Sequence, residues 1–81
     1  MNNLSRYQKV FMNVFSITNE QLVANLKYQS HPSWDSLGHM ALIAALESEF
    51  EINMDMDDVI DFESYEKGIE ILAKYKVTEL A

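Results

Sequence analysis

Apolar residues recur at steps of three and four over residues 36–50, the spacing that aligns side chains along an α-helix. The stripe consists of Leu37, Met40, Ala41, Ile43, Ala44, Leu46 and Phe50, with Leu42 beside it. Ser36 precedes the stripe, and we expect its hydroxyl to cap the helix by accepting from the backbone N–H of Gly38 or His39. A helix of this composition must bury one face, and we expect Leu42, Leu46 and Phe50 to enter the core.

Helical signals also occur before this segment. Apolar spacing predicts a helix over residues 3–15, with Asn2, Asn3 or Ser5 as its cap. Thr18, followed by Gln21 three positions later, has the form of a capping box and predicts a short helical piece through residue 26. The sequence Ser-His-Pro-Ser at 30–33 then breaks the chain, so that much of 16–34 is expected to be a connecting loop.

Two more helices are predicted after residue 50. A brief one is expected from residue 55 or 56 to residue 60, and a last one is expected after Ser64 as its cap, ending near Lys74 or Lys76, where positive charge suits a helix C-terminus. The side chains expected to face inward from the last helix are Tyr65, Ile69, Leu72 and Tyr75. The predicted fold is all-α: a small four-helix bundle with a long loop between the first and second helices and a short third helix.

Length and composition predict one small soluble domain over residues 1–81. No apolar run reaches the 18 or so residues of a membrane helix, and the N-terminus lacks the pattern of a signal peptide, so we expect a cytoplasmic protein without membrane insertion. Cysteine is absent, which excludes disulfides and thiolate zinc sites. We expect a monomer.

The net charge of −7 is concentrated in the middle of the chain. Between residues 35 and 66 there are ten acids and no lysine or arginine: Asp35, Glu47, Glu49, Glu51, Asp55, Asp57, Asp58, Asp61, Glu63 and Glu66. An acidic surface repels phosphate backbones and attracts basic patches on proteins, which argues against a nucleic-acid partner. A solvated face that only keeps the protein soluble is the alternative.

One motif in the chain is similar to that of a known family. Trp34-Asp35-Ser36-Leu37 is followed, over residues 42–52, by the register L-x-x-x-L-E-x-E-F-E-I. Together with the order of predicted helices, this resembles acyl carrier proteins over most of the chain. The resemblance implies that Ser36 receives a 4′-phosphopantetheine arm from coenzyme A, and that Asp35 helps a phosphopantetheinyl transferase to hold Mg²⁺ and coenzyme A. Acyl groups would then travel as thioesters, as in fatty acid biosynthesis and related lipid metabolism.

The same resemblance makes Leu37 an apolar contact for partner enzymes. Met40 and Ala44 lie one and two helical turns further on and would share its side of the helix. These three residues, with Glu47 at the rim, form a candidate docking stripe for acyl-loading and acyl-using enzymes that carry basic patches. Packing of Met40 and Ala44 in the core is the alternative interpretation.

Departures from the family pattern indicate a specialised carrier. Gly38, His39, Ala41 and Ser48 stand where fatty-acid carriers usually have acids or small polar residues, and Asp55 stands where a proline is usual. In place of the usual L-G-A before the motif, this chain has Pro-Ser-Trp at 32–34. The motif D-S-L-G also approaches the D-S-M-G of D-alanyl carriers, so an aminoacyl or peptidyl cargo remains an alternative.

Other classes of function have weaker support. Ser36, His39 and Asp35 suggest a nucleophile with a base, but they crowd one helical turn and G-x-S-x-G is absent, so we do not expect an enzyme; His39 is expected to be an exposed helix residue. The acidic run over 55–61 lacks the central glycine of an EF-hand loop, where Ile60 stands instead, so we predict no metal site there. A helical adaptor in which Ser36 is only a helix cap is the second hypothesis.

Overall fold

Four α-helices make up the regular structure of this computed structural model, which describes residues 2–18, 26–29, 32 and 34–80. They are α1 (Asn3–Phe15), α2 (Ser36–Phe50), α3 (Met56–Asp61) and α4 (Tyr65–Ala73). The all-α prediction and the number and order of the main helices are confirmed within these residues, where the only pairing of β type is a single isolated bridge. The predicted helical piece between Thr18 and Leu26 falls largely outside the described residues.

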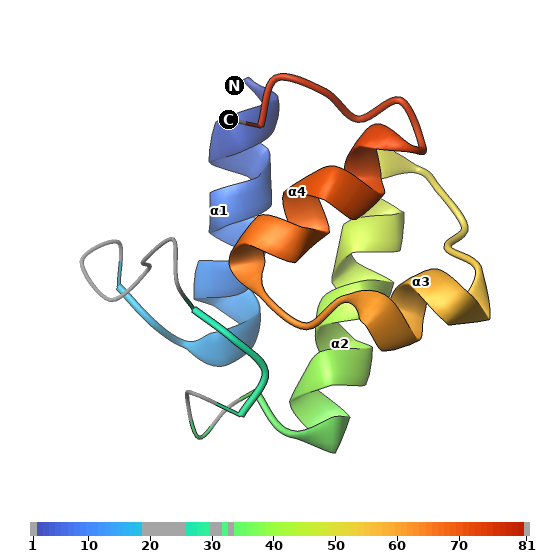
Figure 1. Cartoon of the computed structure of the whole chain (residues 1–81). Helices are drawn as coiled ribbons and strands as arrows, with labels where there is room; N and C mark the ends of the chain where they lie inside the picture. The colour runs from blue at the N-terminus through green and yellow to red at the C-terminus, as the bar shows by residue number, and fades with distance from the viewer. Residues whose placement is uncertain (1, 19–25, 30–31, 33, 81) are drawn as a thin grey trace.

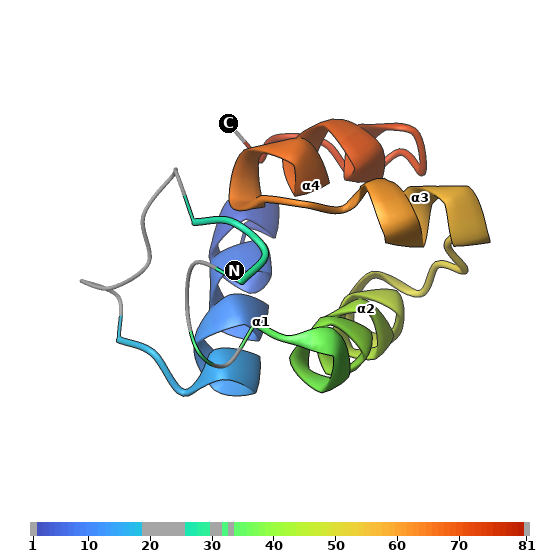
Figure 2. The ribbon, with the colours of Figure 1, turned by 60° about the horizontal axis from the view of Figure 1, so that its bottom comes forward.

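The helices form two layers that cross each other. α1 and α2 are neighbours and run in opposite directions, while α3 and α4 lie across them (Figures 1 and 2). The N-terminal turn of α1 meets the segment that follows α4, where Asn3 Nδ2 donates to the carbonyl of Thr78 at 3.0 Å. No helix in the part of the chain that the structure describes has the length and apolar character to cross a bilayer.

Two helix caps agree with the sequence prediction. Asn2 accepts from the backbone N–H of Ser5 at 2.8 Å at the start of α1, and Ser64 accepts from the N–H of Lys67 at 2.9 Å at the start of α4. Both side chains satisfy amide groups that have no partner within their helix. These local signals suffice to place the starts of α1 and α4.

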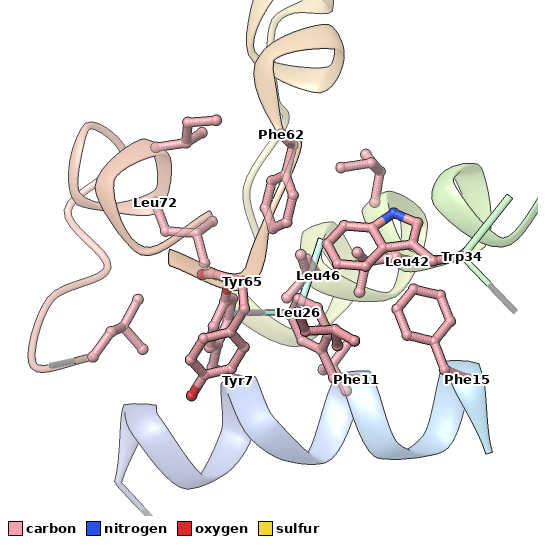
Figure 3. Packing of buried hydrophobic residues seen from close by; sticks show 14 of the residues in the cluster. Tyr7, Phe11, Phe15, Leu26, Trp34, Leu42, Leu46, Phe62, Tyr65 and Leu72 are labelled. Carbon is pink, nitrogen blue, oxygen red and sulfur yellow. Dashed lines mark hydrogen bonds between the residues drawn. The ribbon is translucent and has the colours of Figure 1, made fainter. Parts of the chain in front are cut away.

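The core is built on an aromatic stripe along α1. Tyr7, Phe11 and Phe15 are almost completely buried, at the four-residue spacing that aligns them on one face. Trp34, just before α2, is also buried and packs against two of these rings, with centroids 5.6 Å from Phe11 and 5.3 Å from Phe15 (Figure 3). Trp34 is therefore a core residue.

α2 and α4 complete the core, with three differences from the prediction. Leu42 and Leu46 are fully buried as expected, but Phe50 is half-buried, and the guanidinium of Arg6 lies 4.7 Å from its ring centroid. On α4, Tyr65 and Leu72 are buried as predicted. Ile69 is half-buried instead, and Ile71 takes its place in the core. Tyr75 lies beyond the end of α4 and is half-buried.

The connection before α2 is attached to the connection before α4. Lys27 and Ser64 form an isolated antiparallel bridge. The N–H of Tyr28 donates to the carbonyl of Glu63 at 2.7 Å, and the N–H of Tyr65 donates to the carbonyl of Leu26 at 2.8 Å. Residues 26–29 belong to no helix, but these hydrogen bonds hold them against the rest of the molecule.

Candidate functional site

The helix α2 begins differently from the prediction. Its N-cap is Asp35, whose backbone is extended and whose Oδ1 accepts from the N–H of Gly38 at 2.8 Å. The carbonyl of Asp35 also accepts the N–H of His39 at 2.7 Å. The prediction that Ser36 caps the helix is wrong, because the aspartate one position earlier takes that role and Ser36 becomes the first helical residue.

The hydroxyl of Ser36 is thus left available at the start of α2. The residue is exposed, and its Oγ lies 3.3 Å from the hydroxyl oxygen of Tyr28. The N-terminus of a helix carries partial positive charge from amide groups that lack helical partners. An anionic group attached to this oxygen would lie in a favourable field.

His39 has a structural role that the sequence did not indicate. It is half-buried rather than exposed: Nδ1 accepts from the indole N–H of Trp34 at 3.0 Å, and Nε2 lies 2.8 Å from the carbonyl of Val59. Both contacts are satisfied together when the neutral imidazole carries its proton on Nε2. His39 therefore links the start of α2 to α3 and gives the buried indole its hydrogen-bond partner.

The residues of the candidate docking stripe are exposed. Leu37 is 84% exposed and Met40 is 55% exposed, and Ala44 is exposed two turns further on. The alternative, that Met40 and Ala44 pack in the core, is wrong. Glu47 has a local partner: it is half-buried, and its Oε2 accepts from the backbone N–H of Met54 at 2.8 Å, which attaches the segment after α2 to the helix.

Sequence reasoning missed two exposed apolar residues on α3. Met56 is 69% exposed and Ile60 is 67% exposed, and they lie four positions apart on one face of the helix. With Met40 they border a groove of about 290 Å³ between α2 and α3, lined by Tyr28, His39, Met40, Met56, Val59, Ile60, Phe62 and Glu63. The i, i+4 spacing on α3 was the signal that would have found them.

One member of the acidic run is not a surface group. Asp58 is 5% exposed, and its carboxylate accepts from Lys74 Nζ and from the hydroxyl of Tyr75, each at 2.5 Å. Both hydrogen bonds lower the pKa of Asp58, and the one from Lys74 has the larger effect. The hydrogen bond between Tyr75 and Asp58 also raises the pKa of Tyr75. Asp58 thus anchors α3 to the end of α4.

Most of the remaining acids lie at the surface. Glu49 is exposed and pairs with Arg6 at 2.7 Å. The other exposed acids of the run are Asp35, Glu51, Asp55, Asp57, Asp61, Glu63 and Glu66. In the described ranges, no three His, Asp or Glu side chains are grouped as metal ligands would be.

The site therefore consists of an accessible serine at the start of α2, an exposed apolar stripe along that helix, and a groove next to both. Tyr28 joins these parts, because it contacts Ser36 and lines the groove. Comparison of the chain with protein-family models and with curated proteins finds no match.

Proposed function

We propose that this protein is an acyl carrier protein, in which Ser36 bears a 4′-phosphopantetheine arm. A phosphopantetheinyl transferase attaches the arm: Ser36 Oγ bonds to the phosphorus of coenzyme A that bears the pantetheine, the pyrophosphate bond breaks so that adenosine 3′,5′-bisphosphate leaves, and the serine proton passes to a base. The arm supplies a terminal thiol, which carries acyl groups as thioesters between enzymes of a specialised cytoplasmic pathway. The carrier is not itself an enzyme.

The accessible hydroxyl of Ser36 is the observation that supports this proposal best. A serine that served as the helix cap would have its oxygen engaged with a backbone amide. Here Asp35 fills that role, and Ser36 Oγ remains exposed. The start of α2 therefore does not require the serine, which weakens the alternative that Ser36 is only a cap.

The surroundings of Ser36 suit a phosphodiester. The positive end of the α2 dipole favours an anion, and a first-turn position lets backbone N–H groups face it. Asp35 adds a negative charge nearby, for which the family resemblance supplies a reason: the acid helps the transferase to hold Mg²⁺. The residues present thus fit the arm.

The exposed stripe and the acidic surface support docking on partner enzymes. Leu37 and Met40 offer flexible apolar contacts, and a methionine adapts to several partners. The exposed acids between residues 35 and 66 would pair with basic patches on the partner and speed association. The groove between α2 and α3 would shelter part of the acyl chain.

Measurement of intact mass tests the assignment of Ser36. We expect the protein to gain the mass of one phosphopantetheine arm when it is incubated with a broad-specificity transferase, Mg²⁺ and coenzyme A. Ser36→Ala should gain nothing, because the accepting oxygen is absent. Ser48→Ala removes another exposed serine from α2 and should be modified like the native chain.

Two results would contradict this expectation. Modification of Ser36→Ala would place the arm on another residue. No gain by the folded native protein, with a known carrier modified in the same tube, would favour the helical adaptor. An aminoacyl or peptidyl cargo would be identified in a later experiment, from the activated acid that a cognate enzyme loads onto the arm.

Replacing Leu37 tests the docking stripe. We expect Leu37→Glu to weaken binding of the transferase by about tenfold, because a charge replaces a central apolar contact. Circular dichroism should be unchanged, since the side chain is 84% exposed. Ser48→Glu, which adds the same charge to α2 outside the stripe, should bind the transferase nearly as well as the native chain; equal losses in both variants would refute a specific role for Leu37.

A further inference from the structure

Tyr28 lies beside the attachment point although it comes from a connection between helices. Its backbone is fixed on both sides: the N–H of Tyr28 donates to the Glu63 carbonyl at 2.7 Å, and the N–H of Gln29 donates to the Trp34 carbonyl at 2.9 Å. Gln29 adopts the left-handed conformation, with φ of 65°, which turns the chain at this point. The position of Tyr28 is therefore determined by tertiary contacts.

The side chain of Tyr28 also has contacts that orient it. Its ring packs edge-on against the ring of His39, with centroids 5.5 Å apart and planes at 72°. His39 is itself held by hydrogen bonds to Trp34 and Val59. The phenol oxygen is thereby placed 3.3 Å from Ser36 Oγ, and the ring forms part of the groove wall.

We propose that Tyr28 is a positioning residue for the arm on Ser36: its hydroxyl donates a hydrogen bond to the phosphate, and its ring directs the arm into the groove between α2 and α3. This inference rests on the proposed carrier function. Once Ser36 is esterified it has no proton to donate, so in any hydrogen bond between the two groups the phenol is the donor. A phosphodiester oxygen is a strong acceptor, because hydrogen bonds to charged groups exceed those between neutral ones.

The two roles of Tyr28 act in the same direction. A hydrogen bond to the phosphate restricts the arm where it leaves the protein, and the ring borders the apolar space beyond. The lining of the same groove includes Val59 and Ile60 of α3. The arm is then biased toward the groove instead of extending into solvent, and a thioester near its end is less accessible to small nucleophiles.

Cleavage of a thioester by hydroxylamine tests this proposal. The native protein and Tyr28→Phe are loaded with an octanoyl-phosphopantetheine arm, and the loss of the acyl group is followed by mass. We expect Tyr28→Phe to be cleaved about three- to tenfold faster, as the loss of one hydrogen bond allows. Tyr28→Ala, which also removes the ring, should be cleaved faster still, and Ser48→Ala, an exposed change elsewhere on α2, should match the native chain.

The phosphorus NMR signal of the arm gives a second measurement. It should shift in Tyr28→Phe and stay in place in Ser48→Ala, a difference that a purely structural role for the ring would not produce. Equal cleavage rates and an unshifted signal in a loaded Tyr28→Phe would overturn the role of Tyr28 and leave the carrier function intact. Failure of the native chain to accept an arm would overturn both proposals.

Discussion

Replacing Gly68 with alanine should strongly destabilise the protein, although alanine is the better helix former. Gly68 is buried in α4, and a methyl group there would meet the ring of Phe62 and the hydroxyl of Tyr7; Cε1 of Phe62 is 2.8 Å from the place that the added Cβ would take. Neither neighbour has room to move, because both are fully buried and the Tyr7 hydroxyl donates to the Tyr65 carbonyl at 2.7 Å. Glycine is required here because the packing is close.

The expected magnitude follows from two opposed effects. Helix propensity favours alanine by about 1 kcal/mol, whereas overpacking a core costs about 1–3 kcal/mol and more where neighbours cannot adjust. We expect the steric cost to dominate and the melting temperature to fall by roughly 10 °C. Thermal denaturation followed by circular dichroism measures this change.

A matched control separates sterics from propensity. Glu70→Ala changes an exposed position of the same helix and should leave the melting temperature nearly unchanged. Adding Phe62→Leu to Gly68→Ala should recover part of the loss, because the smaller side chain makes space. An alanine variant more stable than the native protein would show that the helices separate at little cost.

Neutralising Asp58 should be the second most damaging change. The buried carboxylate joins α3 to Lys74 and Tyr75 beyond α4, and Tyr75 also accepts the backbone N–H of Asp55 at 2.9 Å. Asp58→Asn removes the charge that holds the ammonium group, and we expect a fall in melting temperature of roughly 5–10 °C. Asp57→Asn alters the exposed neighbour and should have little effect.

The loss should depend on pH in a defined direction. Hydrogen bonds from Lys74 and Tyr75 lower the pKa of Asp58 below its ordinary 3.8. A carboxyl group of this kind contributes full stability above its ordinary pKa, and the contribution is lost as pH falls through the lower folded value. The difference in melting temperature between native protein and Asp58→Asn should therefore be constant at neutral pH and shrink below about pH 4.

Lys74 and Tyr75, the partners of Asp58, determine where the contribution to stability is lost at alkaline pH. The pKa of Lys74 and that of Tyr75 are raised mainly by their hydrogen bonds to Asp58. Groups with raised pKa values contribute stability that is present below their ordinary values of 10.5 and 10.0 and is lost as pH rises through the folded values. A difference that stayed constant from pH 3 to pH 11 would show that Asp58 does not carry this coupling.

Local sequence patterns were enough to predict the helices α1 to α4 and their order. The spacing of apolar residues and the caps Asn2 and Ser64 are properties of a few neighbouring residues, so the bounds of α1 and the start of α4 could be predicted. Exposure of Leu37 was also predicted. The carrier assignment comes from the motif around Ser36 and stays a prediction until the mass of the modified protein is measured.

The choice among equivalent local signals required distant contacts. Asp35 and Ser36 are both good caps, and the chain path from buried Trp34 into α2 places the aspartate at the cap. Likewise, no local pattern separates Asp58 from Asp57, because Lys74 and Tyr75 reach Asp58 from a segment 16 and 17 residues away. The spacing of apolar residues predicts which of them can share a face of a helix, but their burial depends on what packs against that face. The roles of Tyr28, His39 and Gly68 therefore follow from tertiary packing.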